Sequence, residues 1–240
     1  MRRLVVNTFL TLDGVMQAPG GPEEDPTGGF AYGGWSVEYW DETMSEIITK
    51  AMEAPFDLVL GRKTYEIFAA HWPYTGDHRV PSGDQSALDD TALGLAGRMN
   101  AATKYVASRT LDRVTWQNSR LIAGDVAIEV ARLKNEDGPE LQVHGSSDLL
   151  QTLITAGLID EFRLWIFPVV TGRGKRLFGS GTVPSSLTLV DHRTSTTGVS
   201  IGVYRPAGAI RTGSFALPEP TEAELERRRR MAAEDRAAEG

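Results

Sequence analysis

Apolar and polar residues follow two different periods along most of the chain. Apolar or alternating runs predict β-strands, because successive side chains on a strand point to opposite faces. Five such runs lie at residues 4–12, 56–60, 104–107, 140–143 and 162–170. The last run is almost continuously apolar, which is typical of a central strand that is buried on both faces.

Helical periodicity fills the gaps between these strands. Residues 36–54 carry apolar side chains at spacings of three and four, which places them on one helical face, and Ser36 is available as a cap. Further helices are predicted at residues 64–71, 87–100, 125–135 and 148–156. Strands that alternate with helices favour an α/β domain with a parallel sheet.

Two alternating segments, residues 186–191 and 198–204, follow without a helix between them and predict an antiparallel pair. We therefore expect a three-layer α/β fold with a mostly parallel central sheet and an antiparallel C-terminal edge. This domain is predicted to occupy residues 1–210.

Two long irregular segments interrupt the pattern. Residues 19–35 are rich in Gly and Pro around the acidic centre Glu23-Glu24-Asp25, and a loop of this length is usually a lid or a binding loop. Residues 73–90 are polar and irregular, which indicates an insertion. The first of these loops is a candidate to close over a bound ligand.

Residues 211–240 differ in kind from the rest of the chain. Pro218 and Pro220 mark a linker, and Thr221 with Glu224 forms a capping-box pattern at the start of a charged segment. Glu224 and Arg228 have the spacing of a helix-favouring ion pair, as have Glu226 and Arg230. We expect a charged tail that is helical in part, with its run of arginines forming a solvated helix face.

Composition narrows the class of protein. The 240 residues are 41% hydrophobic and 24% charged, with a formal net charge of −7. There is no cysteine, which excludes disulfides, thiolate zinc sites and a cysteine nucleophile. We find no apolar run long enough to span a membrane and no signal-peptide pattern, so we expect a cytoplasmic protein, and its acidity argues against nucleic acid as a partner.

Three loops carry candidate chemistry, because each follows a predicted strand. Gly61-Arg62-Lys63-Thr64 and Gly145-Ser146-Ser147 each precede a helix, so their backbone N–H groups can face an anion. Ser108-Arg109 adds a hydroxyl and a guanidinium at a third strand end. Each loop alone also fits a plain connection. Together they suit a dinucleotide pyrophosphate or a phosphorylated substrate, although the usual G-x-G-x-x-G fingerprint is absent.

The order of the motifs resembles the dihydrofolate-reductase-like superfamily. Its closest branch is the reductase domain of bifunctional riboflavin-biosynthesis proteins and their stand-alone relatives, and the resemblance covers residues 3–205. It rests on five segments in the right order, namely Thr11-Leu12-Asp13-Gly14, Leu58-Val59-Leu60-Gly61-Arg62-Lys63-Thr64-Tyr65-Glu66, Lys104-Tyr105-Val106-Ala107-Ser108, Val143-His144-Gly145-Ser146-Ser147-Asp148-Leu149 and Phe167-Pro168-Val169-Val170-Thr171-Gly172-Arg173-Gly174-Lys175.

The resemblance implies NADPH as cofactor and a homodimer as the assembly. Ser108 and Arg109 would contact the adenosine 2′-phosphate, for which hydroxyl and guanidinium donors are suited, so NADPH is expected over NADH. The full set of expected cofactor-binding residues is Gly61, Arg62, Lys63, Thr64, Ser108, Arg109, Gly145, Ser146, Ser147, Asp148 and Leu149.

On the substrate side, the resemblance places Thr11 and Asp13 at the pocket, with Asp13 as a candidate catalytic acid; it fits a turn aspartate equally well. Trp40 and Trp165 are candidates to wall the pocket, and Lys175 to contact a substrate phosphate. None of the carboxylates on the helix 36–54 matches the position used by dihydrofolate reductases. The four histidines show no ligand spacing, so no metal site is expected.

The function implied is an NADPH-dependent reductase that transfers hydride to a C=N or C=O carbon of a small heterocyclic or carbonyl substrate. Its reaction would resemble that of 5-amino-6-(5-phosphoribosylamino)uracil reductase of riboflavin biosynthesis. The linked deaminase of the bifunctional proteins needs a His/Cys zinc motif that a chain without cysteine lacks. Two alternatives stay open, a nucleotide-binding or regulatory protein without turnover and a dihydrofolate or pteridine reductase. A third possibility is that the tail serves self-association or a partner.

Overall fold

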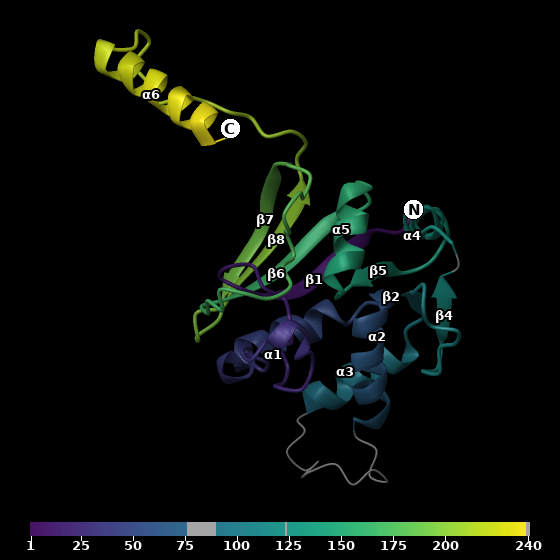
Figure 1. Ribbon diagram of the computed structural model, residues 1–240. Helices are drawn as coiled ribbons and strands as arrows, with labels where there is room; N and C mark the ends of the chain where they lie inside the picture. The colour runs from purple at the N-terminus through teal and green to yellow at the C-terminus, as the bar shows by residue number, and fades with distance from the viewer. Residues whose placement is uncertain (76–89, 123, 239–240) are drawn as a thin grey trace. The chain divides into compact units, whose positions relative to one another are not determined.

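The computed structural model describes residues 1–75, 90–122 and 124–238, and it contains an eight-stranded sheet with the order β4-β3-β2-β5-β1-β6-β8-β7 (Figure 1). The strands from β4 to β6 in this order are parallel, and β8 pairs antiparallel with both β6 and β7. Their bounds are β1 Leu4–Thr11, β2 Phe56–Gly61, β3 Lys104–Ala107, β4 Ser119–Ile122, β5 Glu140–Val143, β6 Glu161–Phe167, β7 Leu187–Thr194 and β8 Ser200–Pro206. The expected fold class is confirmed.

Helices cover both faces of the sheet. One core packs α1 (Glu42–Ala51), α2 (Arg62–His71) and α3 (Asp90–Ala101) against one face, through side chains such as Met44, Tyr65 and Met99. The second core packs α4 (Val126–Asn135) and α5 (Ser147–Thr155) against the other face. Within β6, Trp165 belongs to the first core and Leu164 to the second, because successive strand residues face opposite ways.

The first long helix begins later than its apolar pattern predicts. A short 3-10 turn (Val37–Tyr39) is followed by an extended Trp40, and α1 starts only at Glu42. Asp41, and not Ser36, is the cap, because its Oδ1 accepts the N–H of Met44 at 2.8 Å. The other oxygen of Asp41 accepts the N–H of Thr196 at 2.7 Å, which ties the helix start to the turn between β7 and β8. The prediction of one helix from residue 36 was wrong.

The predicted strand pattern needs two corrections. β4 was not predicted, because its four residues are polar or exposed over most of their length. β6 ends at Phe167 instead of residue 170, since Pro168 has no N–H to donate to a ladder. The predicted helix 87–100 is observed as Asp90–Ala101; its first residues, and most of the predicted insertion 73–90, lie outside the described residues.

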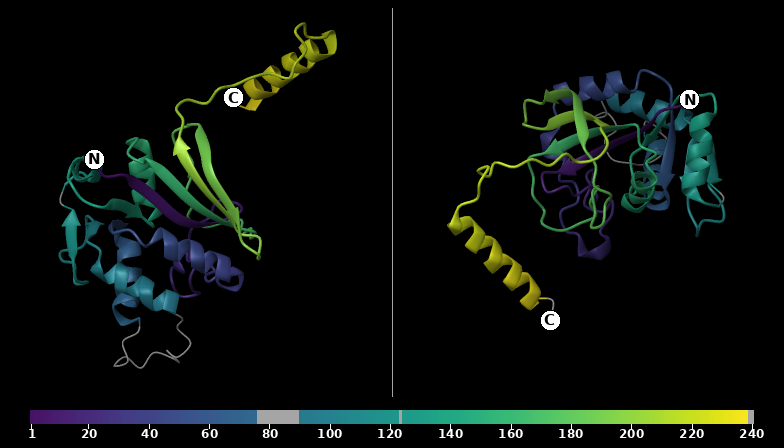
Figure 2. Two further views of the ribbon diagram at one scale, coloured as in Figure 1. Left: turned by 180° about the vertical axis from the view of Figure 1, so that it is seen from behind. Right: turned by 90° about the horizontal axis from the view of Figure 1, so that it is seen from above.

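Contacts divide the chain into two units, Met1–Gly208 and Ala209–Gly240. In the first unit, the chain begins beside α4, where the N–H of Arg2 donates to the carbonyl of Lys134 at 2.8 Å (Figure 2). The second unit contains α6 (Glu222–Ala238), whose first turn is capped by Thr221 Oγ1. None of the helices described here is both long and apolar enough to span a bilayer.

Candidate cofactor and substrate site

A cavity of 540 Å³ opens along the edge where the parallel strands end. Its wall combines β1, the loop after β1, α2 and the turn between β5 and α5, and it extends to α1 and α3. These segments are far apart in sequence. The cavity therefore exists only because β1, β2 and β5 are neighbours in the sheet.

Two helix N-termini meet at this cavity. α2 begins after Gly61 and α5 begins after Ser146, and no side chain caps either helix. The N–H of Gly61 donates to the carbonyl of Gly145 at 3.1 Å, so the two turns are in direct contact. The first-turn amides and dipoles of both helices are thus available to an anion at one place.

The contact between the two turns leaves no room for larger residues. A Cβ atom on Gly61 would lie 3.0 Å from the backbone N of Ser146 and would overlap the Ser146 hydroxyl. A Cβ atom on Gly145 would lie 2.6 Å from Oγ1 of Thr64. Glycine at both positions is what allows the two helix starts to come together.

Five of the eleven predicted cofactor-binding residues lie on the wall of this cavity. Lys63, Thr64, Gly145, Ser146 and Ser147 line the cavity. The first turns hold three more of the predicted residues, which are not on its wall: Arg62 pairs with Glu66 at 3.1 Å, Asp148 is exposed, and Leu149 is buried in the core under α5.

Ser108 and Arg109 lie at the next strand end. Ala107 pairs with Gly61 in the sheet, so these two residues follow at the same edge as the α2 turn. Ser108 Oγ accepts the N–H groups of Thr110 and Leu111 at 3.1 and 3.0 Å, which holds the turn, and Arg109 is exposed. Neither residue lines the cavity; both follow a strand end at the same edge of the sheet.

Asp13 is engaged in the architecture of its loop. Its carboxylate accepts the Thr11 hydroxyl at 2.6 Å and the N–H groups of Thr171 and Gly172 at 3.2 and 2.9 Å, and it pairs with Arg176 at 3.3 Å. Burial alone would raise the pKa of Asp13, but these hydrogen bonds outweigh it and lower the pKa. Thr11 is buried, and neither residue is on the cavity wall.

The predicted tryptophans form an aromatic stack beside the cavity. The ring of Trp40 is parallel to that of Trp165 within 4°, with centroids 6.2 Å apart, and Phe9 contacts both. Trp40 and Phe9 line the cavity, whereas Trp165 is buried behind them. Trp40 is therefore placed to touch a ligand, and Trp165 supports it from the core.

Lys175 lines the cavity but is not a free cation. Its Nζ lies 2.5 Å from Asp25 and 3.0 Å from the hydroxyl of Thr27. Gln17 fastens this part of the loop, since its side chain donates to the carbonyls of Asp25 and Thr27 and accepts the N–H of Lys175. The loop between β1 and α1 thus forms one wall of the cavity.

Glu24 stands on the same wall as Asp25. Its Oε2 accepts the N–H of Gly20 at 2.5 Å, and burial raises the pKa of Glu24. Burial also opposes ionisation of Asp25, but the hydrogen bonds and charge of Lys175 and Thr27 lower the pKa of Asp25. The two adjacent carboxyl groups therefore differ in proton affinity.

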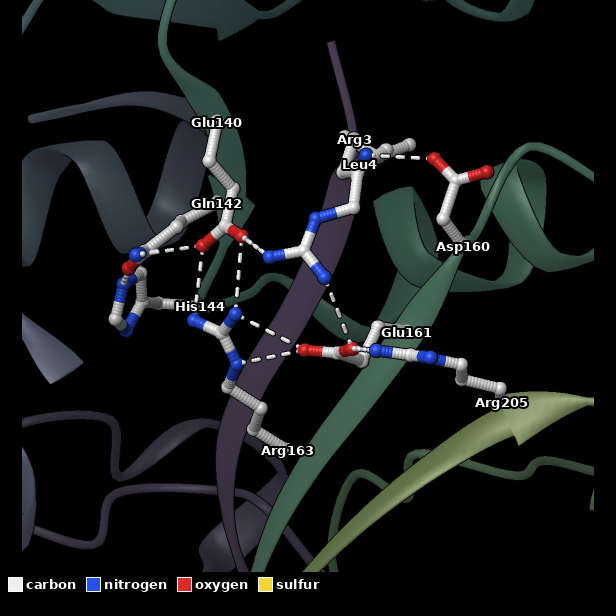
Figure 3. Close-up of polar contacts among 9 residues, drawn as sticks. All are labelled: Arg3, Leu4, Glu140, Gln142, His144, Asp160, Glu161, Arg163 and Arg205. Carbon is white, nitrogen blue, oxygen red and sulfur yellow. Dashed lines mark hydrogen bonds and ion pairs between the residues drawn. The ribbon is translucent and has the colours of Figure 1, made fainter. Parts of the chain in front are cut away.

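His144 connects the cavity to an ion-pair network on the sheet (Figure 3). Its Nε2 is 3.2 Å from the amide oxygen of Gln142, whose NH₂ group donates to Glu140 at 3.1 Å. Two nitrogens of Arg163 bind the two oxygens of Glu140 at 2.8 and 2.9 Å, and Arg163 also pairs with Glu161. Burial, aided by the charge of Arg163, lowers the pKa of His144 to about 4.

Several cavity residues were not predicted from the sequence. On α2, Phe68 and His71 continue the face of Thr64 at spacings of four and three, so helical periodicity could have found them. Asn7 on β1 and His144 after β5 gave no comparable signal. Among the residues that the structure describes, no group of three or more His, Asp or Glu side chains could hold a metal ion.

Comparison with known proteins identifies the family. Residues 2–201 match the RibD C-terminal domain. The chain belongs to the RibD C-terminal domain family. The chain is 30% identical over 207 residues to the protein YyaP of Bacillus subtilis (strain 168), a similarity that covers 85% of this chain and 94% of YyaP.

Two solved structures share the fold of this RibD C-terminal domain. One, named "Putative riboflavin biosynthesis protein", is from Shewanella sp. PV-4, with a TM-score of 0.54, 18% identity and coverage of 85% of this chain and 99% of the other. The second is a diaminohydroxyphosphoribosylaminopyrimidine deaminase/5-amino-6-(5-phosphoribosylamino)uracil reductase from Thermotoga maritima, with a TM-score of 0.52, 13% identity and coverage of 86% of this chain and 57% of the other.

Proposed function

We propose that this RibD C-terminal domain protein is an NADPH-dependent reductase of a small heterocyclic or carbonyl compound. The observation that carries the proposal is the contact between the uncapped starts of α2 and α5 on the wall of one cavity that also exposes Trp40 and Phe9. The helix starts suit a pyrophosphate, and the aromatic wall suits flat rings.

Two groups of residues would hold the two phosphate-containing parts of the cofactor. The amides of the two first turns and the ammonium group of Lys63 would hold the pyrophosphate. Ser108 and Arg109, at the adjacent strand end, would hold the adenosine 2′-phosphate. The cofactor would supply the hydride when bound, and the protein positions the reacting rings and excludes water from them.

A proton must also reach the reduced product. Glu24 is the better placed carboxyl group for this step, because it lines the cavity and burial raises its pKa, which favours the protonated form of the carboxyl group. Asp13 is less suited in this structure, since its low pKa and its hydrogen bonds to the Thr171 and Gly172 amides favour the ionised form.

The engagement of Asp13 also supports a second candidate function, a nucleotide-binding or regulatory protein without turnover. Titration with NADPH and NADH, followed by measurement of nicotinamide oxidation with pterins, ribosylaminopyrimidines, quinones and aldehydes, separates the two. Binding without oxidation of NADPH by any acceptor supports the regulatory protein, and absence of NADPH binding rejects both. Activity with dihydropterins alone would favour the folate or pteridine reductase.

Arg109→Ala tests whether Arg109 binds the adenosine 2′-phosphate of NADPH. We expect roughly a ten- to hundredfold loss of NADPH affinity with NADH affinity unchanged, because a charge-assisted hydrogen bond contributes about 1.5–3 kcal/mol. Isothermal titration calorimetry measures both dissociation constants. Arg113→Ala removes another exposed arginine of the same loop and serves as the control. Equal losses for NADPH and NADH would show that Arg109 does not contact that phosphate.

A further inference from the structure

The cavity continues beyond the two helix starts into an apolar region. α2 runs along its wall from Lys63 to His71, a span of about 12 Å at 1.5 Å per residue. Towards the end of this span the wall is made by Phe68 and Trp72, with Met52 after α1 and Met99 of α3. A pyrophosphate bound by the helix starts would therefore leave a separate, largely aromatic and apolar space for the hydride acceptor.

The charged groups on the wall do not favour an anion in this space. The described wall residues include two lysines, Lys63 and Lys175, and two carboxyl groups, Glu24 and Asp25. Lys63 stands in the first turn of α2 with the pyrophosphate site, and Lys175 is paired with Asp25 at 2.5 Å. A phosphate on the acceptor would have to compete with Asp25 for Lys175, beside a second carboxyl group.

The neighbours of His144, a residue of the cavity wall, define its hydrogen-bonding role. Glu140 is bound by two nitrogens of Arg163, so the group that Gln142 turns towards it must be its NH₂ group, a donor. The amide oxygen of Gln142 then faces Nε2 of His144, which must carry the hydrogen. Nδ1 of His144 is left as an acceptor, and it has no hydrogen-bond partner among the described residues.

We propose that the hydride acceptor is a planar heteroaromatic compound without a phosphate group, which lies against Trp40 and Phe68 and donates an N–H or O–H hydrogen to Nδ1 of His144. This inference rests on the proposed function and names its substrate class. The flat rings match aromatic side chains, and the neutral imidazole supplies a directional contact in a largely apolar space. It also separates this chain from a reductase of phosphoribosylated substrates.

Riboflavin and riboflavin 5′-phosphate form a matched pair of probes, because they share a planar ring with an N–H donor and differ only by the phosphate. Quenching of their fluorescence by the full-length protein gives two dissociation constants without any need for turnover. We expect riboflavin to bind at least tenfold more tightly. Equal or tighter binding of the phosphate, or no binding of either probe at high micromolar concentration, would overturn the proposal.

Two variants test the groups separately. Asp25→Asn removes the carboxylate that pairs with Lys175, so it should tighten binding of the phosphate-bearing probe several-fold and leave riboflavin unchanged. His144→Phe keeps the ring shape but removes the acceptor, so it should weaken both probes by roughly tenfold and keep their ratio. A His144→Phe protein that binds both probes as the parent does would contradict the assigned contact.

The aromatic wall has its own matched control. Phe68→Ala should weaken riboflavin by roughly tenfold, whereas Phe215→Ala, a fully exposed residue of the second unit, should have no effect. NADPH binding is measured in parallel by calorimetry. If the protein binds riboflavin selectively but does not bind NADPH, the proposed reductase is rejected and the inferred substrate class stands. If it binds NADPH but prefers riboflavin 5′-phosphate, the inferred substrate class is rejected and the proposed reductase stands.

Discussion

Asp57 on β2 illustrates how single buried charges stabilise this sheet. Its carboxylate pairs with the buried guanidinium of Arg2 and accepts the N–H of Thr103 at 3.1 Å. Arg2 donates in addition to the carbonyl of Pro139 at 2.6 Å. The pair thus joins residues that lie before β1, before β3 and before β5.

Loss of one partner of this pair should be costly. Asp57→Ala leaves the Arg2 charge buried without a counter-ion, and we expect a loss of about 3–5 kcal/mol in the free energy of unfolding, measured with urea. Glu129→Ala, which breaks a more exposed pair with Arg132, should cost less than about 1 kcal/mol. Similar losses for both variants would contradict the structural role of Asp57.

Lys104 is a second buried charge, but its contacts are of another kind. Its ammonium group donates to the carbonyls of Asn100 and Gln117 at 2.8 and 3.1 Å and lies 4.0 Å from the centre of the Trp116 ring. No carboxylate pairs with it among the described residues. Burial lowers the pKa of Lys104 from 10.5 to about 8.

This shift predicts a pH dependence of stability. Between pH 8 and 10.5 the unfolded chain keeps the Lys104 proton that the folded protein releases, so the free energy of unfolding rises with pH, at up to about 1.4 kcal/mol per unit. Lys104→Met removes this contribution. Across this pH window the parent should therefore gain stability relative to the variant. A difference in their free energies of unfolding that stays constant with pH would refute the lowered pKa of Lys104.

At the scale of elements, the contact between the starts of α2 and α5 is the critical arrangement. Gly61→Ala places a Cβ atom against Ser146 and separates the two turns. We expect NADPH affinity to fall by roughly tenfold, since the pyrophosphate would lose one set of amides. Calorimetry of the variant measures this loss.

A second substitution distinguishes local crowding from general instability. Ser146→Gly in the Gly61→Ala background removes the side chain that the new Cβ would overlap, so it should restore part of the lost NADPH affinity. If the double variant binds no better than Gly61→Ala alone, the two turns do not need to be in contact for binding.

Some of the helices and strands could be predicted from the sequence, and others could not. The apolar runs of β1, β2 and β5 and the glycines after them were predictable, because strand period and turn chemistry are local. The start of α1 was not, since Asp41 prevails over Ser36 through a bond to Thr196, far along the chain. β4 could not be predicted, because the residues of this edge strand are mostly polar or exposed.

The site divides in the same way. Lys63, Thr64 and Ser146 could be predicted because strand ends and helix starts are visible in the sequence. The role of His144 could not, because it depends on Arg163 of β6, which reaches Glu140 only across β1. The pairing of Lys175 with Asp25 is likewise a long-range contact, and it changes a candidate phosphate ligand into a neutralised pair.

At the scale of the whole molecule, all residues of the cavity belong to the unit Met1–Gly208. A chain that ends at Gly208 should therefore keep NADPH affinity within about twofold and unfold as the full chain does. A chain that ends at Val199, and so lacks β8, should not fold. A changed oligomeric state in size-exclusion chromatography after removal of 209–240 would instead assign self-association to the second unit.

The position of β1 has a consequence for the newly made chain. This apolar strand is synthesised well before both of its partners in the sheet, since Leu4 pairs with Leu141 and Val5 with Glu161. Until β5 has been synthesised, β1 has no partner strand, and such an unpaired apolar segment is a binding site for chaperones and a risk for aggregation. The proposed cofactor site is equally delayed, because the turn at Gly145 must emerge before the two helix starts can meet.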